Sequence, residues 1–173
     1  MIGKRKTNVF HVVFTLKNSR YEFQKIKRRK PVGYIASTLP FIDGIEEEII
    51  VEVLSDVAAE LNLDLIALNF CGDHVHCLIC CEIELLPKIM LLWKGKTAYN
   101  FNRRLSTKLN DTYARNGINN NQGLWAKGYF KKALKNENEL FNTINYIINN
   151  RSKHSLKPLS LKLSEKIAST IKK

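Results

Sequence analysis

The apolar run from Leu65 to Cys81 constrains the fold of this chain more than any other segment. Near its middle it is broken by Gly72-Asp73, a dipeptide typical of the tight turn in a β-hairpin. We therefore predict two strands, near Asp64 to Cys71 and His74 to Cys81, that pair with each other.

The second of these strands carries His74-Val75-His76. Alternate side chains of a strand share a face, so His74 and His76 project together from one surface. Two neutral imidazoles side by side form half of a site for a divalent metal. The alternative, which stays open from these residues alone, is two half-buried histidines hydrogen-bonded to backbone carbonyls.

Residues Glu137 to Asn150 predict a helix, with Asn136 or Asn138 as its cap and acidic residues in its first turn. At 100° per residue, Tyr146 and Asn150 lie one turn apart, on the side away from the apolar stripe. This placement indicates a phenol and an amide oxygen presented to a site elsewhere, although an exposed surface tyrosine beside an asparagine would read the same way. The stripe consists of Leu140, Phe141, Ile144, Ile147 and Ile148.

Charge is distributed unevenly along the chain. The net charge of +12 favours a polyanionic partner. Residues 36–84 contain no Lys or Arg and eleven Asp or Glu, so every basic residue lies in the blocks Lys4–Lys30, Lys88–Lys135 and Arg151–Lys173. One block alone is also typical of a solvated surface, but the three together indicate a polarised molecule that binds nucleic acid. The candidate DNA contacts are Lys17, Arg20, Lys94, Lys96, Arg103, Arg104 and Lys127.

The middle basic block also contains aromatic residues. Some of them are candidates for stacking on unpaired bases, whereas most are expected in the core of a chain of this size. Tyr129, in a predicted strand Leu124–Leu134, is the rival to Tyr146 as a nucleophile. The aromatic set is Trp93, Tyr99, Phe101, Trp125, Tyr129 and Phe130.

The remaining segments predict one domain, residues 1–150, followed by a basic tail, residues 151–173. No segment is long enough to cross a membrane or resembles a signal peptide, so we expect a cytoplasmic protein, nucleoid-associated in a prokaryote. The four cysteines are expected as buried reduced thiols, with a zinc site that includes His76 as the alternative. The predicted elements are a strand Asn8–Leu16, a basic stretch Lys17–Pro40, an acidic helix Ile45–Leu61, a helix Pro87–Leu105, a loop Asn116–Gly123 and a tail helix Leu159–Ile171.

Four motifs in order resemble those of the single-tyrosine HUH transposases, the insertion-sequence-200-like enzymes and their REP-associated relatives. The strand Val9–Leu16 followed by Lys17 and Arg20 is similar to the basic turn at the start of that family. The likeness extends from about Asn8 to Asn150. The motifs are Asp73-His74-Val75-His76, Trp93-Lys94-Gly95-Lys96-Thr97-Ala98, Leu124-Trp125-Ala126-Lys127-Gly128-Tyr129-Phe130 and Tyr146-Ile147-Ile148-Asn149-Asn150.

The resemblance implies an α+β fold, a small antiparallel sheet flanked by helices, like the ferredoxin-like and RRM-like palm. It implies that Tyr146 is the catalytic nucleophile and that His74, His76 and Asn150 hold Mg²⁺ or Mn²⁺. Many relatives have glutamine at the position of Asn150, and REP-associated members have asparagine.

The expected function is therefore cleavage and rejoining of single-stranded DNA near hairpins, through a 5′-phosphotyrosine intermediate. A homodimer is expected and a monomer is possible, with the tyrosine acting on its own subunit or on a partner. Two alternatives are a non-catalytic module that binds hairpin nucleic acid, and a hydrolase that uses a metal-bound water. Whether the chain is an active or a domesticated transposase stays open.

Overall fold

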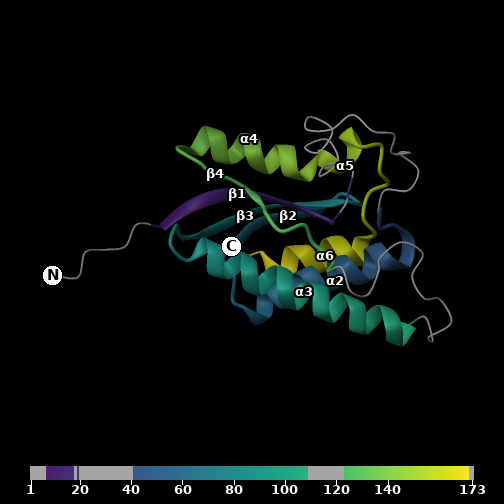
Figure 1. Cartoon of the computed structure of the whole chain (residues 1–173). Helices are drawn as coiled ribbons and strands as arrows, with labels where there is room; N and C mark the ends of the chain where they lie inside the picture. Colours follow the sequence, from purple (N-terminus) through teal and green to yellow (C-terminus); the bar gives the residue numbers. More distant parts are fainter. Residues whose placement is uncertain (1–6, 18, 20–40, 109–122, 172–173) are drawn as a thin grey trace, which may run out of the picture.

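The computed structural model describes residues 7–17, 19, 41–108 and 123–171 (Figure 1). Arg20, the stretch Lys17–Pro40 beyond its first residues, and most of the predicted loop Asn116–Gly123 lie outside the described residues. The elements in chain order are β1 (Thr7–Thr15), α2 (Gly44–Glu60), β2 (Leu65–Phe70), β3 (His74–Glu82), α3 (Leu86–Lys108), β4 (Phe130–Ala133), α4 (Glu137–Ile148), α5 (Asn150–Lys153) and α6 (Leu161–Thr170).

The four strands form one antiparallel sheet in the order β2-β3-β1-β4. The predicted α+β fold, a small antiparallel sheet flanked by helices, is confirmed. The hairpin of β2 and β3 turns at Gly72, whose φ is +74°. A Cβ added there would lie 2.2 Å from the ring of Phe41, so both the backbone angle and the space require glycine.

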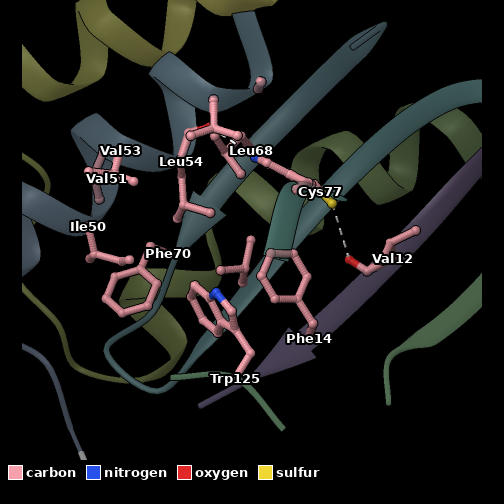
Figure 2. Close-up of a cluster of buried hydrophobic side chains, with 14 of the residues drawn as sticks. Val12, Phe14, Ile50, Val51, Val53, Leu54, Leu68, Phe70, Cys77 and Trp125 are labelled. Carbon is pink, nitrogen blue, oxygen red and sulfur yellow. Dashed lines mark hydrogen bonds between the residues drawn. The ribbon is translucent and has the colours of Figure 1, made fainter. Parts of the chain in front are cut away.

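Helices α2, α3 and α6 cover one face of the sheet, and α4 lies over the other (Figure 1). The main core fills the first face. Phe14 packs edge-on against both tryptophans there, with ring centroids 5.5 Å from Trp93 and 4.9 Å from Trp125. Figure 2 shows Phe14 and Trp125 in this cluster together with Leu54 and Phe70. Both tryptophans of the middle basic block are thus core residues, as predicted for most aromatic residues of that block.

The predicted strand Leu124–Leu134 is wrong over its first half. Only Phe130–Ala133 pairs with β1, as β4. The residues before it run beside the end of β1, where the Lys17 amide donates to the Leu124 carbonyl at 2.9 Å. The reason is Trp125, which turns into the core and donates from Nε1 to the hydroxyl of Thr97 at 2.9 Å.

The apolar stripe predicted on α4 is only partly buried. Ile147 is fully buried, whereas Phe141 is 66% exposed and Ile148 is 64% exposed. A second, smaller apolar cluster lies on this side of the sheet, where Ile147 meets the buried Ala67 and Leu78, with partly buried neighbours that include Leu140 and Ile144 of α4. The candidate site lies on the same face of the sheet, beneath α4.

The C-terminal tail is tied to the main core. Leu163 and Ile167 of α6 are buried in it, against α2. The acidic face of α2 also pairs with basic residues of its neighbours, since Lys166 lies 2.5 Å and Arg104 lies 2.6 Å from the Asp56 carboxylate. The predicted tail helix is confirmed, within narrower bounds, and the division at residue 150 stays a prediction. In the described part of the chain no helix is both long and apolar enough to span a bilayer.

Candidate active site

All four histidines of the chain gather on the sheet face beneath α4. Their rings form a row, in which the centroids of His11 and His76 are 5.3 Å apart, those of His76 and His74 4.9 Å, and those of His74 and His154 5.0 Å. The strands bring three of them together, because β1 and β3 pair antiparallel with Val13 opposite His76. His154 comes from the other side, just after α5.

The Nδ1 atom of each predicted histidine ligand contacts another side chain. Nδ1 of His74 lies 2.7 Å from the carboxylate of Asp73, and Nδ1 of His76 lies 3.1 Å from Nε2 of His11. Both of these contacts involve Nδ1, so Nε2 is the candidate ligating atom of each ring. Burial lowers the pKa of His76 to about 3, with the neighbouring His74, His11, His154 and Lys153 acting in the same direction. His76 is thus a neutral imidazole, the form that binds metals.

Tyr146 approaches the histidine row from α4. Its ring centroid lies 5.4 Å from that of His76 and 6.1 Å from that of His11. The Lys153 ammonium sits over the tyrosine ring, 4.2 Å from its centroid. The side chain is 39% exposed, so the phenol faces both the imidazoles and the solvent. The structure thus places Tyr146 beside His76 of its own chain, and their convergence on a common cation stays a prediction.

Asn150 lies one turn after Tyr146 and is 1% exposed. Its Nδ2 has no hydrogen-bond partner among the described residues. Tyr146, four residues before Asn150, makes a ring contact with His76. His154, four residues after Asn150, makes a ring contact with His74. Asn150 is therefore buried with its amide nitrogen unsatisfied, which is costly for a hydrogen-bond donor.

Helix α4 is fixed at both ends. Asn136 caps its start, where the side-chain oxygen accepts from the Glu139 amide at 2.9 Å. Near its end, Nδ2 of Asn69 in β2 donates to the Ile147 carbonyl at 2.6 Å. These contacts set how far along the sheet Tyr146 lies.

Arg151 fixes the segment after α4. This buried guanidinium donates to the Glu47 carboxylate of α2 at 2.6 Å, to the Phe70 carbonyl at the end of β2 at 2.8 Å, and to the Lys157 carbonyl at 2.7 Å. Because Arg151 follows Asn150 directly, the same contacts hold Asn150 in place.

The donor set fits a divalent cation. Two imidazoles and an amide oxygen suit Mg²⁺ or Mn²⁺ less strongly than carboxylates would, but they leave positions open for phosphate oxygens. A carboxylate behind a ligating imidazole, as Asp73 stands behind His74, is the usual outer contact of a metal site. Across the described ranges, no three His, Cys, Asp or Glu side chains converge to hold a metal by themselves, so the predicted site depends on its amide ligand.

That same finding leaves no support for a zinc site built from His76 and the cysteines. None of the four cysteines forms a disulfide. Burial raises the pKa of Cys77, and burial followed by the acidic neighbours Cys80 and Glu82 raises that of Cys81 to about 11. The thiols of Cys77 and Cys81 therefore stay protonated, and a protonated thiol is a poor metal ligand.

Tyr129 lies apart from the histidines. It packs against the main core, on the α2 and α3 side of the sheet. Burial raises the pKa of its phenol, with a smaller contribution from Cys81. This position favours Tyr146 as the nucleophile.

Three of the seven predicted DNA contacts have partners away from this site. Lys94 donates to the Ala126 carbonyl at 2.6 Å and to the Gly128 carbonyl at 2.9 Å, which anchors the segment before β4. Lys96 pairs with Glu60, and Arg104 pairs with Asp56, both on α2. Their DNA-binding role stays a prediction, as it does for the partly buried Lys17 and the exposed Arg103 and Lys127.

Sequence reasoning missed His11, His154 and Lys153. One signal was available, since Tyr146, Asn150 and His154 are spaced by four residues and so fall on one side of a continuous helix. His11 had no local signal, because its place depends on which strand pairs with β1.

Comparison with known proteins identifies the family of the chain. Residues 5–150 match the family described as "Transposase IS200 like". The chain belongs to the IS200-like transposase family. It is therefore a transposase, an enzyme that transfers DNA strands, and the predicted family is confirmed.

Two solved structures are similar to this transposase. One is a REP-associated tyrosine transposase bound to a REP hairpin, 14% identical, with a TM-score of 0.46 over 87% of this chain and 70% of that one. The other is a protein of Deinococcus radiodurans R1 provisionally assigned as a transposase, 18% identical, with a TM-score of 0.48 over 87% of this chain and 95% of that one. No curated protein matches the chain.

Proposed function

We propose that this transposase cleaves and rejoins single-stranded DNA through a covalent bond to Tyr146, with Mg²⁺ or Mn²⁺ held by His74, His76 and Asn150. The observation that carries the proposal is the approach of the Tyr146 ring to within 5.4 Å of His76, centroid to centroid, from a separate helix. Histidine pairs that serve only to stabilise a sheet have no need of an accessible phenol beside them.

In the proposed step, the Tyr146 oxygen attacks the scissile phosphorus. A phosphotyrosine bond to the 5′ side forms while the bond from phosphorus to the 3′ oxygen breaks. The phenol loses its proton, and the departing 3′ oxygen gains one to become a free hydroxyl. A bound divalent cation would supply Lewis acidity and hold the phosphate oxygens. Because the phosphodiester energy is kept in the new bond, a 3′ hydroxyl can later reverse the step and rejoin the strand.

The chain's own residues have defined tasks in this proposal. His11 and Asp73 orient the two ligating imidazoles through their Nδ1 atoms. Lys153, over the Tyr146 ring, brings positive charge to the place where phenolate and phosphate meet. A cation there favours an ionised phenol and attracts the DNA backbone.

We further propose that the cleaved strand lies beside a hairpin. Asn150 in place of glutamine is the feature that this chain shares with REP-associated members. The substrate for the test is accordingly a labelled oligonucleotide with a hairpin and an unpaired 5′ flank.

Incubation with Mn²⁺ is expected to yield a protein–DNA adduct that survives denaturing electrophoresis, and a chelator should prevent it. Cleavage without an adduct would point instead to hydrolysis by a metal-bound water. Salt-sensitive binding in the presence of chelator, with neither adduct nor cleavage under any metal, would identify a non-catalytic hairpin-binding module.

Replacement of His11 by alanine is expected to weaken Mn²⁺ binding about tenfold, because the His76 ring loses the contact that fixes its orientation. Isothermal titration of the full chain with Mn²⁺ measures this directly, without DNA. His11→Gln, whose amide oxygen can still accept from Nδ1 of His76, should recover part of the affinity. Unchanged affinity in His11→Ala would remove His11 from the metal site.

The contacts of Asn69 and Arg151 hold α4 and α5 on the sheet of their own chain. We therefore propose that Tyr146 acts within its own subunit, whether or not the expected dimer forms. Mixing the inactive variants His74→Ala and Tyr146→Phe should then restore no adduct. Adduct formation in the mixture would mean that subunits exchange their tyrosine helices.

A further inference from the structure

We propose that Phe130 is a stacking platform for the unpaired base next to the scissile phosphate. This inference rests on the proposed single-strand function and adds a contact for the DNA. Phe130 is the first residue of β4, and its ring is 50% exposed. It differs in this from Trp93, Phe101 and Trp125 of the same block, all of which are buried in the core.

The position of Phe130 relative to the nucleophile is the first support. Its ring centroid lies 6.1 Å from that of His11, at an interplanar angle of 76°. His11 in turn lies 6.1 Å from Tyr146, centroid to centroid. An exposed aromatic ring thus stands at the border of the site, separated from the reacting phenol by a single imidazole. A strand bound at Tyr146 would carry its neighbouring nucleotide into this region.

The charge around Phe130 identifies the class of ligand. Lys131 and Lys132 follow it in β4, and all four residues of the strand are exposed. Lys132 is the register partner of His11, so it shares the site's face of the sheet. Lys153 lies over the Tyr146 ring, 4.2 Å from its centroid, and Lys132 lies 3.6 Å from the Glu139 carboxylate. An exposed aromatic ring beside lysines, next to the proposed phosphoryl-transfer centre, has the composition of single-strand binding surfaces, where bases stack and lysines follow the backbone.

The strand's place in the sheet supports access. Among the described strands, in the order β2-β3-β1-β4, β4 is at the edge and pairs with β1 alone. Proteins commonly protect such edges with lysines, as Lys131 and Lys132 do here, whereas a half-exposed phenylalanine serves no such purpose. Stacking on a base would bury the ring without any change in the sheet.

The test uses a single-stranded oligonucleotide with one 2-aminopurine, moved base by base along the strand, and the full chain in chelator so that no cleavage occurs. The wild type should quench the 2-aminopurine fluorescence most strongly when the probe base lies next to the cleavage point. Phe130→Ala should lose that quenching and raise the dissociation constant about tenfold. Phe130→Trp should retain both, and its own emission should fall on binding.

Tyr99→Ala is the matched control, since Tyr99 is 67% exposed but lies on α3, across the sheet from α4. It should bind like the wild type. Equal quenching and affinity in the wild type and Phe130→Ala would overturn the proposal, as would an equal loss in Tyr99→Ala. A changed sedimentation coefficient in Phe130→Ala, with unchanged DNA binding, would instead make Phe130 a contact between copies of the chain.

This outcome is separable from that of the proposed function. An adduct formed by the wild type, together with normal binding by Phe130→Ala, would reject the platform and keep the chemistry. Position-specific quenching without any adduct would keep the platform and reject the chemistry.

Discussion

Replacement of Tyr146 by phenylalanine is expected to abolish the covalent adduct and to lower strand cleavage about a thousandfold or more, because the variant lacks the oxygen that forms the new bond to phosphorus. The ring itself remains, so its packing against His76 and its contact with Lys153 should be kept. Denaturing electrophoresis measures the adduct, and a gel-shift assay in chelator should report DNA binding close to that of the wild type.

Tyr129→Phe is the matched control. Tyr129 is the alternative tyrosine of the sequence motif, but it packs against the main core and away from the histidines. Its phenylalanine variant should form adduct at the normal rate. If Tyr146→Phe formed the adduct and Tyr129→Phe did not, Tyr129 would be the nucleophile. The reaction would then take place away from the four histidines.

Replacement of Arg151 by methionine is expected to destabilise the fold by about 3–5 kcal/mol, because it leaves Glu47 and two backbone carbonyls without their donor. For a chain of this size, the melting temperature should fall on the order of 10 °C. Thermal unfolding followed by circular dichroism gives the value. Adduct formation should fall as well, even below the unfolding transition, since Asn150 and Lys153 flank the lost anchor.

Lys162→Met supplies the comparison, because Lys162 pairs with Glu52 at the exposed surface. Exposed ion pairs contribute little to stability, so its melting temperature should barely change. Adding Glu47→Leu to Arg151→Met should recover part of the lost stability, because it removes the carboxylate that had lost its partner. A melting temperature of Arg151→Met within a few degrees of the wild type would contradict the proposed role of this anchor.

Local patterns predicted most of the elements. Turn chemistry at Gly72-Asp73 fixed the hairpin, and alternation along β3 put His74 and His76 on one face. The cap of α4 is Asn136, one of the two asparagines that the residue types predicted for it. In each case, the determining contacts are made between residues close together in the sequence.

The parts that were missed depend on contacts between distant residues. The register of β1 against β3 brings His11 to His76, and no pattern around His11 contains that information. Burial of Asn150 likewise depends on Arg151 reaching α2 and the end of β2. The predicted strand Leu124–Leu134 was too long for a similar reason. Trp125 turns into the core and donates to Thr97, a contact between residues far apart in the sequence.

The ion pairs of α2 with α3 and α6 bear on how the protein would respond to salt. Lys96, Arg104 and Lys166 already have carboxylate partners, so they displace few cations from a nucleic acid unless those pairs open. The logarithm of single-strand affinity changes with that of salt concentration by about 0.7 for each phosphate neutralised. These three side chains should therefore contribute little to counterion release, although all three count toward the formal charge of +12.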